Sequence, residues 1–434
     1  MKVRFEPAAT PHAAGGGAVA PVVDKIVRQA REASRRLAIC PTATKNQALR
    51  VMAARFRRNK AEIQAANRKD LEAGRAAGLS GALLDRLELT DQRIEAMATG
   101  LEEVAALQDP VGEITEVRTR PNGLRVGRMR APIGVVGIIY EARPNVTADA
   151  GCLCVKSGNA VVLRGGKEAF HSNTIIARLM DEAGTEAGLP TGSIQLIPTT
   201  DRAAVGEMLG RDDCIDLIIP RGGRSLIETV VKNSLIPVIK HYDGNCFLYI
   251  DRTADPRMAV ELAVNSKTQR AGVCNAAESL LIHRDIAATV GADVIKALVA
   301  AGVEVRADPA LRNLVAGLGE ATEQDWRTEY LDMVITAGVV DSAEQAIERI
   351  NAWGSHHTDA IVTEHHPTAM QFLSAVDSSC VFVNCSTRFS DGGQFGMGCE
   401  IGISTDKLHA RGPMGLEELT TRKFVVFGQG QTRL

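Results

Sequence analysis

The sequence is poor in aromatic residues and carries almost no net charge. Phe, Trp and Tyr make up 4% of the 434 residues, and 50 Lys and Arg against 52 Asp and Glu give a net charge of −2. Proteins that bind nucleic acids combine basic surfaces with aromatic side chains that stack on bases. The composition therefore predicts no nucleic-acid partner. The sequence also has no run of about 18 apolar residues, so we expect no membrane-spanning helix.

A disulfide framework and a targeting segment are also lacking. The nine cysteines are an odd number without framework spacing, and residues 1–20 contain the run Gly15-Gly16-Gly17 in place of an apolar stretch. Such cysteines are typical of reduced thiols in cytoplasmic proteins. We therefore expect a cytoplasmic protein whose residues 1–20 form a disordered tail.

A third absence concerns the G-x-G-x-x-G fingerprint of dinucleotide-binding proteins. Gly396-Met397-Gly398 is followed by Gly402, which lies one residue too far along the chain for that spacing. A plain Rossmann dehydrogenase therefore loses support.

The order of apolar segments predicts two α/β domains and an accessory sheet. Helical spacing dominates 22–108, and 110–132 alternates like a hairpin around Pro121-Asn122-Gly123. Short apolar strands then alternate with helical stretches, up to a strand expected at 237–240. This alternation is typical of parallel sheets covered on both faces. A second alternating set follows, and a last strand is expected near Phe424-Val425-Val426-Phe427.

These patterns divide the chain into four parts. We predict a tail at 1–20, a cofactor-binding domain at 21–244, a catalytic domain at 245–412, and a strand at 413–434 that returns to the cofactor-binding domain. The fold class is α/β, with two doubly wound domains, of which the first is Rossmann-like. The hairpin 110–132 and the last strand leave free edges that favour oligomerisation.

Two strand-to-helix junctions carry glycine pairs beside cationic residues. The first is Arg164-Gly165-Gly166-Lys167 and the second is Arg221-Gly222-Gly223. Glycines let a phosphate approach the backbone, and the amides at a helix start favour its negative charge. Each junction can also be a tight turn with solvated side chains. Both follow strands at the edge of the sheet where α/β proteins bind ligands, so we predict phosphate-binding turns.

Cys274 is the cysteine whose surroundings indicate chemistry. It follows the loop Ala271-Gly272-Val273, with Lys267 and Arg270 nearby, and we expect a short helix to begin there. Helix amides and cations stabilise the thiolate, which is the nucleophilic form. The other eight cysteines are expected to be small buried side chains.

The paired histidines are not expected to bind a metal. His356-His357 and His365-His366 have no Cys or carboxylate at a spacing that completes a zinc site. We therefore predict surface histidines and no metal site.

The order of these features resembles the aldehyde dehydrogenase superfamily, and longer motifs resemble its glutamate-5-semialdehyde dehydrogenase family. The resemblance covers about residues 22–434. Its motifs are Tyr140-Glu141-Ala142-Arg143-Pro144-Asn145-Val146-Thr147, Leu163-Arg164-Gly165-Gly166-Lys167-Glu168, Pro220-Arg221-Gly222-Gly223-Arg224, Lys267-Thr268-Gln269-Arg270-Ala271-Gly272-Val273-Cys274-Asn275 and Thr328-Glu329-Tyr330-Leu331-Asp332.

The resemblance implies an NADP-dependent oxidoreductase. Members of that family reduce L-glutamate 5-phosphate with NADPH, and the products are L-glutamate 5-semialdehyde and phosphate. This reaction is the second step of proline biosynthesis from glutamate. The reaction also suggests a functional link to glutamate 5-kinase, and the free edges of the hairpin and the last strand predict a homodimer or tetramer.

Roles for single residues follow from the same resemblance. Cys274 corresponds to the nucleophile that forms a thioester, and Asn145 lies where the superfamily places an oxyanion-hole Asn. Arg164 and Glu329 fall where the cofactor ribose groups are held. The cations Arg164 and Lys167 also suit the 2′-phosphate of NADPH. The candidates for substrate binding are Gln269, Arg270 and Arg388.

His241 marks a departure from the superfamily. Aldehyde-oxidising members carry a Glu there, which activates water against the thioester. A reductase must protect its thioester, so we expect the His241 ring to turn away from it or to be held by a neighbour such as Asp243. Two alternatives stay open: an NAD(P)-dependent dehydrogenase that oxidises a small aldehyde, and a non-catalytic α/β module that binds a nucleotide or a partner.

Overall fold

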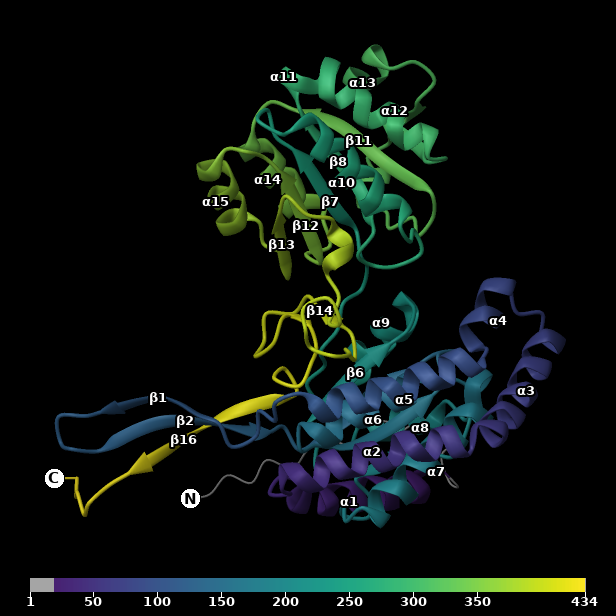
Figure 1. Ribbon diagram of the computed structural model, residues 1–434, viewed down its shortest axis with the longest axis vertical. Helices are drawn as coiled ribbons and strands as arrows, with labels where there is room; N and C mark the ends of the chain where they lie inside the picture. The colour runs from purple at the N-terminus through teal and green to yellow at the C-terminus, as the bar shows by residue number, and fades with distance from the viewer. Residues whose placement is uncertain (1–18, 434) are drawn as a thin grey trace, which may run out of the picture.

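The computed structural model describes residues 19–433, which form two lobes and a projecting arm (Figure 1). The lobe drawn low in Figure 1 is built from the N-terminal half of the chain, and the lobe above it holds the second sheet. Nearly all of the tail expected at 1–20 lies outside the described residues.

Within the described residues, five helices precede the first strand, as the helical spacing of 22–108 predicts. Two of them begin with side-chain caps: Oγ of Ser80 accepts from the Leu83 N–H and Oγ1 of Thr90 accepts from the Arg93 N–H. Such caps satisfy backbone donors that have no partner inside the helix. The helices are α1 (Ala20–Leu37), α2 (Thr42–Arg58), α3 (Lys60–Ala76), α4 (Gly81–Leu87) and α5 (Asp91–Ala106).

The first sheet has four parallel strands in the order β5-β4-β3-β6. Its inner strand β3 is buried on both faces. Val136 and Ile138 pack into one apolar core, and Val135 and Ile139 pack into another. The prediction of a strand at 237–240 is wrong, because Val238 forms a single isolated β-bridge, to Ile218 of β6. The elements are β3 (Val135–Tyr140), α6 (Asn145–Lys156), β4 (Ala160–Gly165), η1 (Lys167–Ala169), α7 (Phe170–Glu186), β5 (Ile194–Leu196), α8 (Ala203–Leu209), β6 (Leu217–Arg221) and α9 (Arg224–Asn233).

The second sheet has seven strands in the order β10-β9-β11-β8-β7-β12-β13, and they are parallel. Its first helix begins with Asp255 as cap and a proline in the first turn, where the missing N–H costs nothing. The elements are β7 (Cys246–Ile250), α10 (Pro256–Thr268), β8 (Ala277–His283), α11 (Arg284–Ile286), η2 (Ala287–Gly291), α12 (Ala292–Ala300), β9 (Glu304–Ala307), α13 (Pro309–Leu314), β10 (Gly319–Glu320), η3 (Asp325–Arg327), β11 (Val334–Val340), α14 (Ala343–Trp353), β12 (Thr358–Val362), α15 (His366–Ala375), β13 (Cys380–Val383) and η4 (Thr387–Phe389). The prediction of two α/β units with parallel sheets is confirmed.

The arm is a third, antiparallel sheet in the order β1-β2-β16. The predicted hairpin forms β1 (Ile114–Thr119) and β2 (Arg125–Pro132), and β16 (Thr420–Phe427) pairs with β2 along its whole length. The C-terminal strand therefore lies beside a hairpin that is about 300 residues away in the sequence, as Figure 1 shows.

A return segment connects the second sheet to the arm and crosses back over the first lobe. It contains β14 (Ile403–Ser404) and β15 (Gly412–Pro413), which pair with each other. Ile401 and Ala410 already belong to the core of the first lobe. The chain thus rejoins that lobe before position 412, where the sequence analysis placed the end of the catalytic domain.

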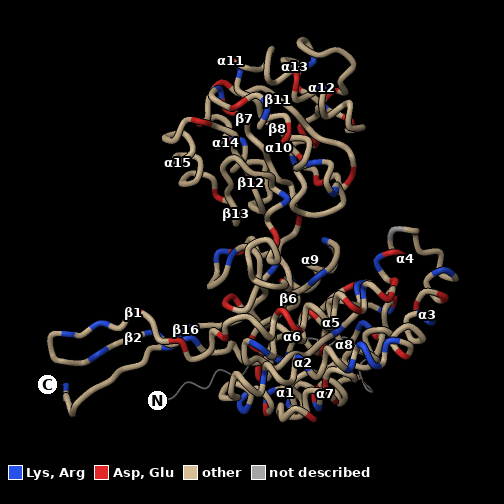
Figure 2. Tube along the Cα trace, in the orientation of Figure 1, with Lys and Arg blue, Asp and Glu red and all other residues tan. Residues whose placement is uncertain are grey.

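Charged residues of both signs alternate over the helices of the first lobe, as Figure 2 shows. Many of them form ion pairs, such as Arg57 with Glu102 at 2.5 Å. This interspersed pattern fits a surface in contact with water. Among the described residues, no helix combines the length and apolar character needed to cross a bilayer.

Candidate active site

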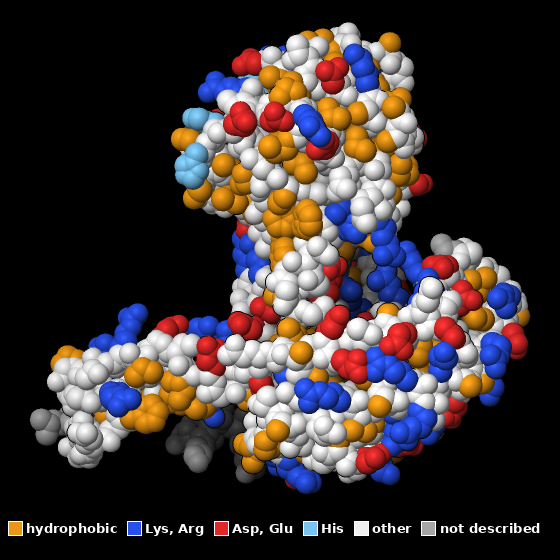
Figure 3. All heavy atoms as spheres, in the orientation of Figure 1, with side chains coloured by type: hydrophobic (Ala, Val, Ile, Leu, Met, Phe, Trp, Pro, Cys, Tyr) orange, Lys and Arg blue, Asp and Glu red, His pale blue; other side chains and the backbone are white. Residues whose placement is uncertain are grey.

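A cavity of about 580 Å³ between the two lobes is the candidate active site. Its walls come from the loops after β3 and β6, from the loop between α10 and β8, and from the return segment. The first two loops lie at the carboxyl ends of parallel strands, where α/β proteins bind ligands. Figure 3 shows the hollow between the lobes, with Lys and Arg side chains at its rim.

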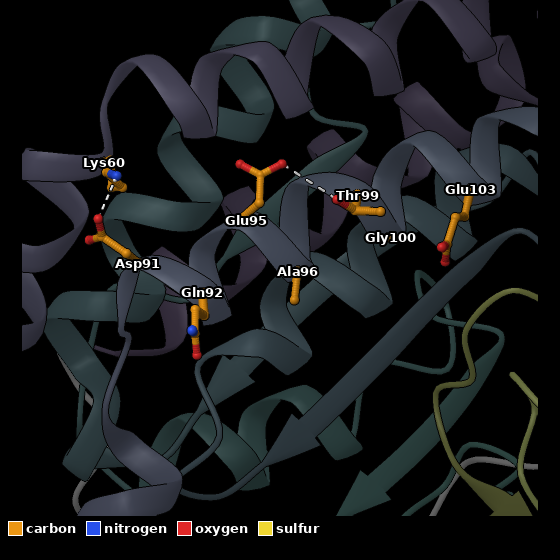
Figure 4. A pocket seen from close by; sticks show the side chains of 8 residues that line it. All are labelled: Lys60, Asp91, Gln92, Glu95, Ala96, Thr99, Gly100 and Glu103. Atoms are coloured by element: carbon orange, nitrogen blue, oxygen red, sulfur yellow. Dashed lines mark hydrogen bonds and ion pairs between the residues drawn. The ribbon is translucent and has the colours of Figure 1, made fainter.

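A second hollow, of about 690 Å³, lies along α5 and is open to solvent (Figure 4). Lys60 pairs with Asp91 at 2.7 Å at one end of this hollow, and Glu95 and then Glu103 follow further along α5. The side chains of this hollow are mostly acidic or uncharged, so it does not suit an anionic ligand. None of the site residues expected from the sequence lines it.

Cys274 lies in a turn between α10 and β8, with its side chain partly exposed in the cavity. The short helix expected at this position is wrong, because residues 271–276 form turns and β8 follows directly. Two residues that precede or begin β7 hold the backbone of this turn in place. Sγ of Cys246 donates to the carbonyl oxygen of Cys274 at 3.2 Å, and Gly244 packs directly against the Cys274 backbone.

Six arginines supply the positive charge of the cavity. Loss of contact with water lowers the pKa values of Arg143 and Arg388, and neighbouring guanidinium groups lower them further. A negative charge on Cys274 acts in the opposite direction on both groups, and all three residues line the cavity. Such crowding of like charges favours a ligand with negative groups. The six are Arg86, Arg143, Arg221, Arg224, Arg270 and Arg388.

Lys267, which the sequence places near the thiol, pairs with a carboxylate instead. Its Nζ lies 2.5 Å from Oε2 of Glu278, and both side chains are fully buried. Burial raises the pKa of Glu278 to about 7 and lowers that of Lys267. The pair joins α10 to β8, so Lys267 supports the loop that carries Cys274.

The ring of His241 faces Cys274. One of its nitrogens lies within 4.8 Å of Sγ of Cys274, so the ring does not turn away from the thiol. The alternative expectation, a ring held as a donor by a neighbour, is confirmed, and the neighbour is Ile403. Nδ1 of His241 lies 2.8 Å from the carbonyl oxygen of Ile403, which can only accept, so Nδ1 carries the proton. Asp243 does not hold this ring, because its carboxylate pairs with Arg224 at 2.6 Å.

His357 is a residue beside Cys274 that the sequence analysis missed. It was expected on the surface, but its side chain is fully buried and lies within 4.8 Å of the ligand atoms of His241 and Cys274. Burial lowers its pKa to about 4, so the ring is neutral at physiological pH. Residue spacing gave no signal, since Cys274 and His357 precede different strands of one sheet, β8 and β12, and lie far apart in the sequence.

Glu329 lines the cavity beside the nucleophile loop. Burial raises its pKa, and a hydrogen bond from the backbone of Gly244 opposes that shift. Glu400 lies on the other wall, where the Gly392 N–H donates to its Oε2 at 2.9 Å and burial raises its pKa. Five carboxylates thus share the cavity lining with the arginines: Glu141, Asp243, Glu329, Asp391 and Glu400.

The second glycine turn reaches the cavity. Arg221, Gly222 and Gly223 all line it, at the start of α9. The Gly223 N–H donates to Oε2 of Glu141 at 2.9 Å, so this carboxylate already occupies one amide of the helix start. An anion that binds there has to share or displace that contact.

The first glycine turn lies outside the cavity lining. Arg164 is only 6% exposed, and its guanidinium group donates to the carbonyl oxygens of Gly165, Thr200 and Asp201. A Cβ on Gly165 would collide with the Asn173 side chain, so that glycine serves packing. Lys167 is exposed and is the cation that this turn displays to solvent.

Two further expected site residues also lie outside the lining. Asn145 begins α6, and its Nδ2 donates to Oδ2 of Asp149 at 2.9 Å. Gln269 accepts from Nε of Arg388 at 2.9 Å, so it touches a cavity residue without lining the cavity itself. The structure therefore brings together Cys274, Arg221, Gly222, Gly223, Arg270, Arg388 and Glu329.

Comparison with known proteins identifies relatives along nearly the whole chain. A γ-glutamyl phosphate reductase from Geotalea daltonii is 55% identical over 415 residues, which are 96% of this chain and 99% of the relative. The enzyme of the same name from Moorella thermoacetica is 54% identical over 406 residues, 94% of this chain and 97% of that one.

A solved structure and a family model agree with these sequences. The crystal structure of γ-glutamyl phosphate reductase from Thermotoga maritima superposes with a TM-score of 0.93 at 45% identity, covering 95% of this chain and all of that one. The sequence model of the aldehyde dehydrogenase family matches residues 9–315. The chain therefore belongs to the aldehyde dehydrogenase family and, within it, to the γ-glutamyl phosphate reductases.

Proposed function

We propose that this chain reduces L-glutamate 5-phosphate with NADPH to L-glutamate 5-semialdehyde and phosphate, the second step of proline biosynthesis from glutamate. The observation that carries the proposal is the position of Cys274, a thiol inside a cavity walled by six arginines. A nucleophile surrounded by guanidinium groups suits an electrophile that bears a phosphate group.

In this proposal the arginines divide the substrate between them. Arg143 and Arg388, which line the cavity together with Cys274, bind the phosphate that leaves, because the leaving group must lie beside the nucleophile. Arg270 binds the α-carboxylate, and Gln269 holds Arg388 in place through its hydrogen bond. The α-amino group is positive and finds Glu400 on the opposite wall.

Cys274 then carries the substrate through two steps. Its sulfur attacks the carbonyl carbon of the acyl phosphate, the bond from carbon to the phosphate oxygen breaks, and phosphate leaves. A nicotinamide cofactor supplies the hydride that reduces the resulting thioester. Collapse of the thiohemiacetal releases the aldehyde and restores the thiolate. We assign Asn145, after a small movement of the start of α6, to the oxyanion that forms in each step.

The residues at the edge of the first sheet fit a dinucleotide. Arg221, Gly222 and Gly223 offer a cation and close backbone approach at the start of α9, and Glu329 offers a carboxylate to a ribose hydroxyl. Arg164 and Gly165 end β4, Gly166 and Lys167 follow it, and β3 separates this strand from β6 in the sheet. We assign the 2′-phosphate of NADPH to Lys167, with Arg164 fixing the turn around it.

The proposal extends to the assembly and the setting of the enzyme. The arm formed by β1, β2 and β16 joins subunits into a homodimer or tetramer, since its outer strands can each add a partner strand. An acyl phosphate hydrolyses readily, so a glutamate 5-kinase must supply it nearby. The nine cysteines form no disulfide among the described residues, which fits a reducing cytoplasm.

One assay separates this function from aldehyde oxidation. The purified enzyme is given L-glutamate 5-semialdehyde and NADP⁺ with and without phosphate, and NADPH is followed by absorbance. We expect NADPH to form only with phosphate, because the thioester needs phosphate as the acceptor. Equal rates without phosphate would identify an aldehyde oxidiser, in which water takes the acyl group.

A further inference from the structure

We propose that Cys274, His241 and His357 form a binding site for a thiophilic divalent cation such as Zn²⁺. Each residue offers one sulfur or ring nitrogen, and the three ligand atoms lie within 4.8 Å of one another. A tetrahedral zinc ion with bonds of about 2.0–2.3 Å holds its ligands roughly 3.3–3.8 Å apart. Small side-chain movements therefore close the site, and the cavity leaves a fourth position open to water.

His357 presents a lone pair that nothing else uses. Its Nε2 is buried and has no hydrogen-bond partner among the described residues. Its Nδ1 lies 2.9 Å from Oγ1 of Thr358, whose hydroxyl donates to Ser390 at 2.8 Å. Nδ1 must therefore carry the proton, which leaves the lone pair on Nε2. Buried polar atoms without partners are rare in proteins, and a bound cation would supply the missing contact.

His241 has the same tautomer. Its Nδ1 donates to the backbone carbonyl of Ile403 at 2.8 Å, so its Nε2 also keeps a lone pair. Histidines that bind metals usually donate their other N–H to a carbonyl or carboxylate, which fixes the ring. Both rings are thus held in the form that a metal requires, on either side of a thiol.

The surrounding charges set the strength and selectivity of the site. The guanidinium groups of Arg143 and Arg388 repel a cation. At His357 the charges of Glu329 and Glu400 favour a positive charge, and the charge of Arg221 opposes it. We expect weaker binding than at a closed structural zinc site. Thiolate and imidazole ligands select Zn²⁺ or Co²⁺ over Mg²⁺. Binding forms a bond from sulfur to metal and releases the thiol proton to solvent.

The site implies inhibition. A cation on Sγ of Cys274 removes the electron pair that attacks the acyl phosphate, so Zn²⁺ should block reduction until a chelator removes it. Only this effect on catalysis rests on the proposed function. The binding of the metal does not depend on it.

Cobalt provides a spectroscopic test on the intact enzyme. The purified, EDTA-treated protein is titrated with Co²⁺, and absorbance from thiolate-to-cobalt charge transfer is recorded. We expect one Co²⁺ per chain with a charge-transfer band that Zn²⁺ abolishes by displacement. Zn²⁺ should also slow alkylation of Cys274 by iodoacetamide, as measured by mass spectrometry. Absence of the band at one equivalent would overturn the proposal.

Matched variants assign the ligands. Cys274→Ser should remove the band, and His241→Gln and His357→Gln should each weaken cobalt binding by at least about tenfold. Cys385→Ser and His366→Gln change a thiol and an imidazole outside the cluster, and should bind cobalt as the wild type does. If His357→Gln does not fold, His241→Gln decides, because that ring is partly exposed. Unchanged binding in the His241 variant, or loss in a control, would contradict the assignment.

Discussion

Gly244 and Cys274 lie backbone against backbone. A Cβ on Gly244 would lie 2.5 Å from Cα of Cys274 and closer still to its carbonyl oxygen. Both atoms belong to the backbone and cannot rotate away as a side chain does. Glycine at this position therefore decides where the nucleophile stands.

Gly244→Ala should lower kcat by roughly a hundredfold, because a displacement of about 1 Å at a reacting group has that effect. The matched control is Gly272→Ala in the same loop, where the nearest atom to the added carbon is the Leu331 oxygen at 3.6 Å. That variant should keep most of its activity. Steady-state kinetics with circular dichroism checks both, and equal activities in the two variants would refute the argument.

Cys274→Ala should abolish reduction and leave NADPH binding largely intact. The thiol forms the covalent intermediate, while the cofactor phosphates are expected at Arg221 and beyond. Steady-state turnover tests the loss of reduction, and a fluorescence titration with NADPH tests whether cofactor binding is retained. Cys385→Ala, a partly exposed thiol outside the cavity, serves as control. Activity above about a hundredth of wild type would remove Cys274 from the mechanism.

The sequence predicted the elements of the fold more closely than the geometry of the site. Periodicity and turn residues located β3 at Val135–Tyr140 and the arm hairpin, because local pattern and tertiary burial agree there. The strand expected at 237–240 failed. Its apolar residues do pack, since Ile239 is 1% exposed, but the segment forms one bridge rather than a ladder.

Side-chain placement at the site could not be predicted from local pattern. His357 directly precedes β12 and His241 precedes β7, and their rings pack against each other with centroids 5.4 Å apart, so no spacing along the chain connects the two residues. Arg164 has the residue type of a cofactor ligand, yet its guanidinium group caps backbone carbonyls of a loop 36 residues ahead. Both outcomes depend on contacts between distant segments.

The buried guanidinium group of Arg164 leads to a prediction about the preference for NADPH over NADH. Lys167→Ala should weaken NADPH more than NADH, because the exposed ammonium is assigned to the 2′-phosphate. Arg164→Ala should weaken both cofactors alike and lower the Tm, since it removes the bonds to Thr200 and Asp201. Titration with each cofactor checks this. Equal losses of NADPH and NADH in the Lys167 variant would contradict the assignment.

Asp359 should make stability depend on pH. Its carboxyl group is buried in β12, where Oδ1 accepts from the Phe247 N–H at 2.7 Å and Oδ2 from Ser378, and burial raises its pKa to about 7. The folded state therefore holds a proton that the unfolded chain, with a pKa near 3.8, has released. Stability from this group is present below about pH 4 and is lost as pH rises through 7.

Asp359→Asn should remove that dependence. A pKa shift from 3.8 to about 7 corresponds to about 4 kcal/mol. As the pH rises from 4 to 8, the free energy of unfolding of the variant should therefore increase relative to that of the wild type by up to that amount. Tm values with EDTA at several pH values measure the gain. Asp293→Asn, on an exposed position of α12, should show no such trend. A difference in Tm between the Asp359 variant and the wild type that stays constant with pH would contradict the predicted loss of stability at rising pH.

Phe424 should stabilise the oligomer proposed for the arm. It is 69% exposed on β16, and Val426, Phe427 and Val117 are also exposed on the same sheet. Figure 3 shows hydrophobic side chains gathered on the arm. Among the described residues β1 and β16 form the edges of this sheet, so a second arm can pair with either. Burial of one Phe contributes about 1.5–3 kcal/mol, and symmetry doubles the effect in a dimer.

Phe424→Asp should therefore weaken self-association by more than about a hundredfold, since both copies of the side chain are lost. Sedimentation velocity over a range of concentrations measures this. The matched control is Leu314→Asp, which places the same charge on a residue that is 46% exposed in the other lobe. That variant should sediment as wild type does. If wild type is monomeric at micromolar concentration, or if both variants associate equally, subunits do not join through the arm, and its apolar surface must serve another contact.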